Sequence, residues 1–176
     1  MNYATIKYND IANGIGVRTS LFVSGCTHHC KGCFNSVAWD FMYGEPFTED
    51  VENAILKSLD TEFNDGLTLL GGEPFEPQNQ AVLLPFLKKV KKAFPNKTIW
   101  CYTGYIMDTD LLKPSKAKTV HTKEMLSLID VLVDGPFIEE QKNISLRFKG
   151  SENQRIIDVK ESLKQNKVVL FEIEKY

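Results

Sequence analysis

Short apolar segments alternate along the chain with longer amphipathic segments. The apolar segments predict strands, and the amphipathic segments, whose apolar residues recur at helical spacing, predict helices. This alternation favours a mainly parallel α/β sheet joined by right-handed crossovers. We expect strands at 1–10, 17–24, 67–70, 98–102, 129–133 and 168–172, and helices at 48–59, 79–93 and 122–128.

The length of the chain limits how far such a sheet can close. A complete barrel of eight strand–helix units takes about 250 residues, whereas this chain has 176. We therefore expect one domain over residues 1–176, built as a partial (β/α) barrel with an open, mostly parallel sheet. Chemistry in such folds gathers at the carboxyl ends of the strands.

The unusual residues of the sequence follow expected strands. Cys26 follows the first apolar strand, Gly71-Gly72-Glu73-Pro74 ends a second, and Asp134-Gly135 ends a third. Since the carboxyl ends of parallel strands lie at one edge of a sheet, we expect these segments to converge there.

Composition and charge exclude several function classes. Apolar residues make up 43% and charged residues 25% of the chain, ordinary values for a globular protein. The formal net charge of −2 provides no basic field to collect nucleic acid or anionic lipid. No window is long and apolar enough to span a membrane, and the polar N-terminus lacks the pattern of a signal peptide. We expect a cytoplasmic protein that binds neither nucleic acid nor a membrane.

Three of the four cysteines, Cys26, Cys30 and Cys33, lie within one short segment with the spacing C-x3-C-x2-C. Without a secretory signal, such crowding favours metal binding or redox chemistry over disulfides. Iron–sulfur clusters are normally held by four thiolates. Three thiolates from one loop leave one iron of a 4Fe–4S cluster without a ligand from that loop. An open metal position suits a catalytic site, as it does for zinc.

Two other arrangements of these residues remain open. The loop would form a Cys3His zinc site if His28 or His29 supplied a fourth ligand, and otherwise these histidines support the loop by hydrogen bonds. Cys101 would close an electron-transfer cluster as a fourth thiolate, although its apolar surroundings favour a buried, inert thiol.

The cysteine motif, together with Gly71-Gly72-Glu73-Pro74, resembles the radical S-adenosylmethionine superfamily. Within it, the chain is similar to the anaerobic ribonucleoside-triphosphate reductase-activating proteins. The segments that carry this closer resemblance are 13–18, 22–26, 32–35, 71–75, 102–105, 130–137 and 153–158.

The resemblance implies a radical mechanism. Cys26, Cys30 and Cys33 would bind three irons of a 4Fe–4S cluster, and S-adenosylmethionine would chelate the fourth. One electron, from a donor such as flavodoxin, would cleave the sulfonium to methionine and a 5′-deoxyadenosyl radical. That radical would take a hydrogen atom from a glycine of the large subunit of the reductase. The protein itself would position the reactants and exclude water.

The resemblance also implies contacts to S-adenosylmethionine around the third cysteine. Gly32, Cys33 and Phe34 would offer backbone hydrogen bonds and a flat ring to the adenine. Many superfamily members carry an aromatic residue just before the third cysteine, whereas this chain has Gly32, so Phe34 or Tyr102 would take over the packing.

Further implied contacts come from the ends of two other strands. Gly71 and Gly72 lack side chains and so allow backbone to approach a ligand. Glu73 would accept a hydrogen bond from the ammonium of the methionine moiety or orient its own loop. Asp134 would bind the ribose or the amino group, or else begin the turn at Gly135.

Among the basic residues, Arg18 is expected to reach the cofactor carboxylate or to form a structural ion pair. Arg147 and Arg155 are candidates for partner docking or a late cofactor contact, and the lysines of 88–92 for a solvated helix end.

Two alternative functions remain at this stage. One is a small-molecule radical S-adenosylmethionine enzyme such as 7-carboxy-7-deazaguanine synthase. The other is a non-enzymatic zinc or iron–sulfur interaction module.

Overall fold

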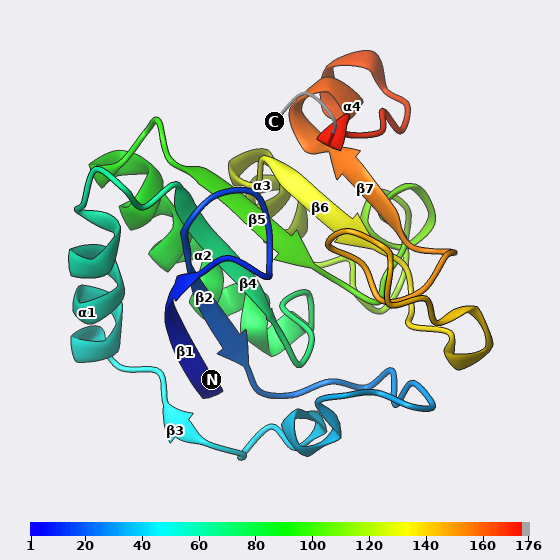
Figure 1. Cartoon of the computed structure of the whole chain (residues 1–176), viewed down its shortest axis with the longest axis horizontal. Coiled ribbons are helices and arrows are strands. Elements are labelled where there is room, and N and C mark those ends of the chain that lie inside the picture. The colour runs from blue at the N-terminus through cyan, green and yellow to red at the C-terminus, as the bar shows by residue number, and fades with distance from the viewer. Residues whose placement is uncertain (174–176) are drawn as a thin grey trace.

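A computed structural model describes residues 1–173, within which seven strands form one sheet in the order β3-β1-β2-β4-β5-β6-β7 (Figure 1). The strands are β1 (Asn2–Asp10), β2 (Arg18–Val23), β3 (Glu45–Pro46), β4 (Gly66–Gly71), β5 (Thr98–Tyr102), β6 (Val131–Asp134) and β7 (Arg155–Asp158). The α-helices are α1 (Glu49–Leu59), α2 (Pro77–Ala93), α3 (Thr122–Leu128) and α4 (Val159–Gln165).

The middle of the sheet is parallel, as the alternation predicted. Strands β2, β4, β5 and β6 pair in parallel, while β1, β3 and β7 add antiparallel pairings at the two edges. β1 and β2 are joined by residues 11–17 alone, a connection too short for the crossover that a parallel pair needs. The fold is thus α/β with a mixed sheet.

The C-terminal part of the chain differs from expectation. The strand predicted at 168–172 is wrong, because this segment makes only an isolated bridge between Leu170 and Ile157. Asn166 ends α4 in the left-handed conformation (φ 51°) and turns the chain back along β7. We did not predict β7, since its apolar stretch is only Ile156-Ile157 between charged residues.

The helices follow their end signals closely. Thr48 is the N-cap residue of α1, whose first turn carries three acidic residues that favour a helix N-terminus. α2 begins two residues before the predicted start because Pro77 fits the first turn of a helix. Near its end, Lys88, Lys89 and Lys92 are exposed, as expected of a solvated helix end, whereas Lys91 is partly buried and pairs with Asp130.

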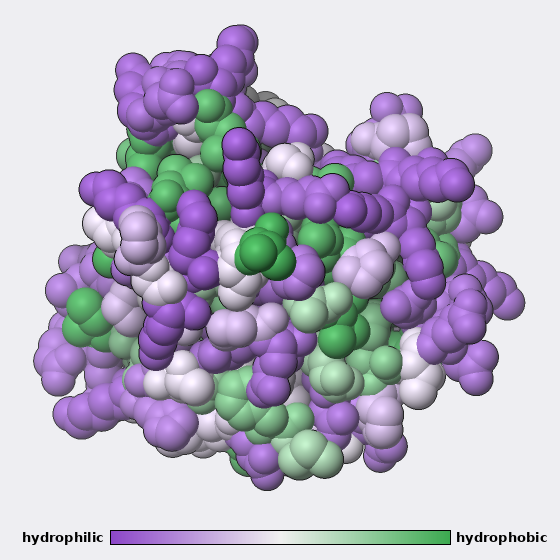
Figure 2. Space-filling model, turned by 180° about the vertical axis from the view of Figure 1, so that it is seen from behind, coloured by the Kyte–Doolittle hydropathy of each residue, from purple (hydrophilic) through white to green (hydrophobic). Residues whose placement is uncertain are grey.

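The two faces of the sheet are covered differently. One face packs its apolar side chains, such as Leu21, Leu69 and Leu132, against the helices in the main hydrophobic core. On the other face, Trp100 and Val133 belong to a smaller apolar cluster, and the loop at 11–17 crosses this side of the strands (Figure 1). Seen from behind, hydrophilic side chains cover most of the surface, with apolar ones between them (Figure 2). Among the described helices, none has both the length and the hydropathy of a membrane span.

Arg18 is buried at the amino ends of the parallel strands. Its guanidinium N–H groups donate to the carbonyl oxygens of Ile15, Leu67 and Thr98 and to the hydroxyls of Thr68 and Thr98, at 2.8–3.0 Å. Both expected roles of Arg18 are therefore wrong, because its donors go to neutral oxygens of the chain. Burial lowers the pKa of Arg18 to about 10, so the group stays charged at neutral pH.

Replacing Arg18 with methionine should lower the free energy of unfolding by about 3 kcal/mol or more, because each buried acceptor left without a donor costs about 1–3 kcal/mol. Urea unfolding of the anoxic protein measures this change. Arg147→Met is the control, since Arg147 is exposed and its loss should cost less than about 0.5 kcal/mol. Equal stability of the two variants would contradict the role given to Arg18.

Candidate metal and cofactor site

A cavity of about 430 Å³ opens at the carboxyl ends of β4, β5 and β6. Its volume lies in the range of about 300–1,000 Å³ that is typical of small-molecule sites. The predicted site residues that line it are Cys26, Cys30, Gly32, Cys33, Phe34, Gly71, Gly72 and Glu73. The structure thus brings two distant segments of the sequence, 26–34 and 71–73, together at one edge of the sheet.

The segment that carries the three cysteines is closed at its base by backbone hydrogen bonds. The amide of Gly25 donates to the carbonyl oxygen of Ala38 at 2.8 Å, and the amide of Cys26 donates to that of Trp39 at 3.1 Å. Ala38 and Trp39 belong to the short 3-10 helix Ser36–Trp39. All three cysteines of this closed loop line one cavity.

The thiols are held in a partly buried environment. Burial raises the pKa of Cys26 to about 12, although backbone N–H groups of His28 and His29 act in the opposite direction. Burial also raises the pKa of Cys30, against the backbone N–H of Phe137. Amide donors next to cysteine sulfurs stabilise thiolates, and the positive charge of a bound metal group would complete that stabilisation. This donor set fits a thiolate-ligated cluster.

The two histidines of the loop have other partners. The Nε2 atom of His28 lies 3.0 Å from the carboxylate of Glu73, and the ring of His29 stacks on Trp39 with centroids 4.6 Å apart. Within residues 1–173, no three His, Cys, Asp or Glu side chains converge as one metal ion would require. The contacts of these rings favour supporting roles over zinc ligation.

Cys101 lies away from the other cysteines. It is fully buried on β5 in the main hydrophobic core, on the side of the sheet that packs against the helices. Burial raises its pKa well above the usual value, and the charge of Glu73 adds to the shift. This is the environment of a buried, inert thiol.

Gly71, the last residue of β4, and Gly72, which follows it, allow this part of the chain to approach the backbone of Gly25 closely. Gly71 has a φ of +106°, a conformation that favours glycine. A Cβ atom on Gly72 would lie 2.6 Å from the carbonyl oxygen of Gly25. The amide of Glu73 donates to that same oxygen at 2.8 Å. The glycines therefore dock the end of β4 directly under the base of the cysteine loop.

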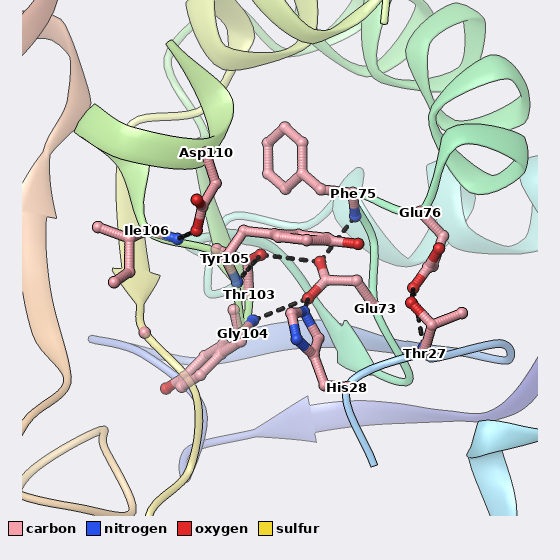
Figure 3. Close-up of polar contacts among 12 residues, drawn as sticks. Thr27, His28, Glu73, Phe75, Glu76, Thr103, Gly104, Tyr105, Ile106 and Asp110 are labelled. Carbon is pink, nitrogen blue, oxygen red and sulfur yellow. Dashed lines mark hydrogen bonds and ion pairs between the residues drawn. The ribbon is translucent and has the colours of Figure 1, made fainter. Parts of the chain in front are cut away.

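Glu73 is buried and its carboxylate is surrounded by donors (Figure 3). One oxygen accepts from the amide of Phe75 and the hydroxyl of Thr103, both at 2.8 Å. The other accepts from the amide of Gly104 at 2.7 Å and faces Nε2 of His28. Of the two roles expected for Glu73, these contacts favour the orientation of its own loop.

Asp134 lies at the end of β6, but it does not line the cavity in the described chain. Its carboxylate accepts from Arg155 at 2.6 and 2.9 Å and from the amide of Met107 at 2.8 Å. Arg155 also contacts Asp108, and its hydrogen bonds to these acids raise its pKa. Cofactor binding by Asp134 stays a prediction. Arg155 forms ion pairs with Asp134 and Asp108, and its expected roles in partner docking or a late cofactor contact also stay predictions.

One wall of the cavity was not predicted from the sequence. Residues from the loop between β6 and β7, including Phe137, Ile144, Phe148 and Gln154, line it. Two of these residues could have been found from the sequence, because Phe137 and Gln154 lie in segments that carry the family resemblance. Ile144 stands in polar surroundings without periodicity, so nothing in the sequence marked it.

Comparison with known proteins agrees with this geometry. The model of the family described as a 4Fe-4S single cluster domain matches residues 12–157. The anaerobic ribonucleoside-triphosphate reductase-activating protein of Pasteurella multocida is 48% identical over 158 residues, which cover 89% of this chain and 96% of that protein. The protein of the same name from Enterobacteria phage T4 is 37% identical over 158 residues, covering 89% and 93%.

These matches first define the class, a domain that holds one iron–sulfur cluster. Within that class, the chain belongs to the family of anaerobic ribonucleoside-triphosphate reductase-activating proteins. The resemblance found in its motifs is confirmed.

The position of Cys101 generates a prediction about iron binding. Cys101→Ala should keep the iron and sulfide content of the anoxically reconstituted protein, because this thiol is enclosed in the core. Cys26→Ala, Cys30→Ala and Cys33→Ala should each lose most of it, since each removes a thiol from the cavity wall. Iron and sulfide analysis of each variant measures these contents. Loss of iron in Cys101→Ala would contradict the assignment of Cys101 as an inert thiol.

Proposed function

We propose that this chain activates anaerobic ribonucleotide reductase by generating a glycyl radical on its large subunit. The observation that carries the proposal is the closed loop whose three thiols, and no fourth cysteine of the described chain, line the cavity. Cys26, Cys30 and Cys33 hold a 4Fe–4S cluster, and the remaining iron is left to S-adenosylmethionine. Family membership supports the same conclusion, because the relatives are named for activating this reductase.

The chemistry supplied at such a site is the one-electron cleavage of S-adenosylmethionine to methionine and a 5′-deoxyadenosyl radical, which takes a hydrogen atom from a glycine of the reductase. The electron comes from a separate donor such as flavodoxin. A cytoplasmic location suits the proposal, because free thiols persist in that compartment.

The chain's own residues bind and orient the reactants. The backbone at Gly71, Gly72 and Glu73 forms one wall for S-adenosylmethionine, and Gly32 and Cys33 offer it backbone hydrogen bonds from another wall of the same cavity. Phe34 and Tyr102 are the aromatic side chains proposed to pack against the adenine. We place these groups at the carboxyl edge of a partial barrel whose loops keep bulk water from the radical.

The mouth of the cavity suits a protein substrate. Phe34 is 86% exposed and Ile144 is 92% exposed, although both line the cavity. Exposed apolar side chains at the entrance to a site favour an apolar contact with a partner. A backbone glycine of a large subunit must enter this opening, so we assign Ile144 to the surface that contacts the reductase.

The decisive experiment combines anoxically reconstituted protein, S-adenosylmethionine, a reductant and the large reductase subunit. The expected product is a protein-centred glycyl doublet in the electron paramagnetic resonance spectrum, together with 5′-deoxyadenosine and methionine. Cleavage of S-adenosylmethionine without any such doublet would refute the proposed partner. Absence of cleavage by a protein that holds its cluster would refute the radical mechanism.

Ile144→Asp should reduce glycyl radical formation at least about 10-fold, as expected for a central interface side chain. Cleavage of S-adenosylmethionine in the absence of the reductase should change little, because the side chain lies at the mouth. Val120→Asp is the matched control, since Val120 is 90% exposed and does not line the cavity. Equal effects of the two substitutions would contradict the assigned surface.

A further inference from the structure

The loop between the first two cysteines is attached to the ends of two central strands by one histidine. His28 lies between Cys26 and Cys30, and its Nε2 atom is 3.0 Å from the carboxylate of Glu73. Its side chain is 15% exposed, and that of Glu73 is 1% exposed. Figure 3 shows the ring pointing from the loop toward this carboxylate. Since a carboxylate accepts hydrogen bonds, Nε2 is the donor.

The ring of His28 is fixed by packing as well as by this hydrogen bond. Its centroid lies 4.3 Å from that of Tyr105, at an interplanar angle of 62°. On the side of Gly104 there is no room for a methyl group, because a Cβ atom there would lie 2.6 Å from Cδ2 of His28. The ring is thus packed between Tyr105 and Gly104 while its Nε2 atom reaches Glu73.

A neighbouring contact attaches the same loop to the start of α2. The amide and hydroxyl of Thr27 both donate to one carboxylate oxygen of Glu76, at 2.8 and 2.6 Å. Thr27 and His28 directly follow Cys26. Both therefore contact carboxylates of the segment 73–76, Thr27 that of Glu76 and His28 that of Glu73. Of the two contacts, only that of His28 also connects the loop to the end of β5. Its acceptor Glu73 accepts further hydrogen bonds from Thr103 and Gly104, which follow β5.

We propose that His28 is a positioning residue, whose hydrogen bond to Glu73 sets the place of Cys26 and Cys30 relative to the strand ends that bind S-adenosylmethionine. The inference rests on the proposed function and deepens it. His28 lines the cavity, but this role does not require contact with the cluster or the substrate. It acts through the loop, as residues that orient metal ligands do in other sites.

The test uses substitutions that separate the donor from the ring. His28→Gln keeps an N–H donor near the position of Nε2, whereas His28→Phe keeps a ring without the donor. Gly104→Ala leaves both partners intact but pushes the ring aside. His121→Gln is the control, since it makes the same chemical change at a histidine that does not line the cavity.

Two measurements follow the loop directly. In anoxic apoprotein, amide hydrogen exchange of residues 26–33 should be faster in His28→Phe and Gly104→Ala than in the wild type. In reconstituted protein, these variants should lose iron to a chelator about 10-fold faster and show altered g values for the reduced cluster. His28→Gln and His121→Gln should resemble the wild type in both.

The outcomes separate this inference from the proposed function. Unchanged exchange and iron loss in His28→Phe and Gly104→Ala would overturn the positioning role while leaving the function intact. Equal damage in His28→Gln and His28→Phe would also overturn it, because the donor would then be irrelevant. If wild-type protein held no 4Fe–4S cluster, the proposed function would fail, and the exchange measurement on apoprotein would still decide the role of His28.

Discussion

The buried carboxylate of Glu73 is the interaction on which the site depends. A carboxylate in a protein interior is costly unless donors surround it, and the donors here come from three segments: the turn after β4, the end of β5 and the cysteine loop. Satisfying one charge therefore fixes three segments relative to one another. The glycines before Glu73 make this possible, because they let the chain pass directly beneath Gly25.

A second buried charge holds the opposite end of the parallel strands. Arg18 donates to carbonyl oxygens at the starts of β4 and β5, much as Glu73 accepts from groups at their ends. Neither charge depends mainly on an ion of opposite sign. Each is solvated largely by neutral groups of the chain, a role that water would otherwise fill. The central strands are thus held at both ends by polar contacts and between them by the apolar core.

The sequence predicted the strands and helices whose apolar periodicity or end residues lie within their own segments. The strands β2, β4 and β5 and the helices α1 and α3 have clear periodicity or end signals, and their bounds agree closely with expectation. The antiparallel β7 was missed because its short apolar stretch gains its pairing from β6, a contact between distant segments. In the site, spacing predicted the cysteine loop and the family resemblance predicted Gly71-Gly72, and the structure places both segments at one cavity. The partner of Asp134 was not predictable, since Arg155 meets it only after folding.

The loop between β6 and the antiparallel strand β7 affects how the site can vary. It lines the cavity at the carboxyl ends of the central strands. Loops tolerate insertion and replacement far better than strands do. This wall of the cavity can therefore change without disturbing the sheet that carries the cysteine loop.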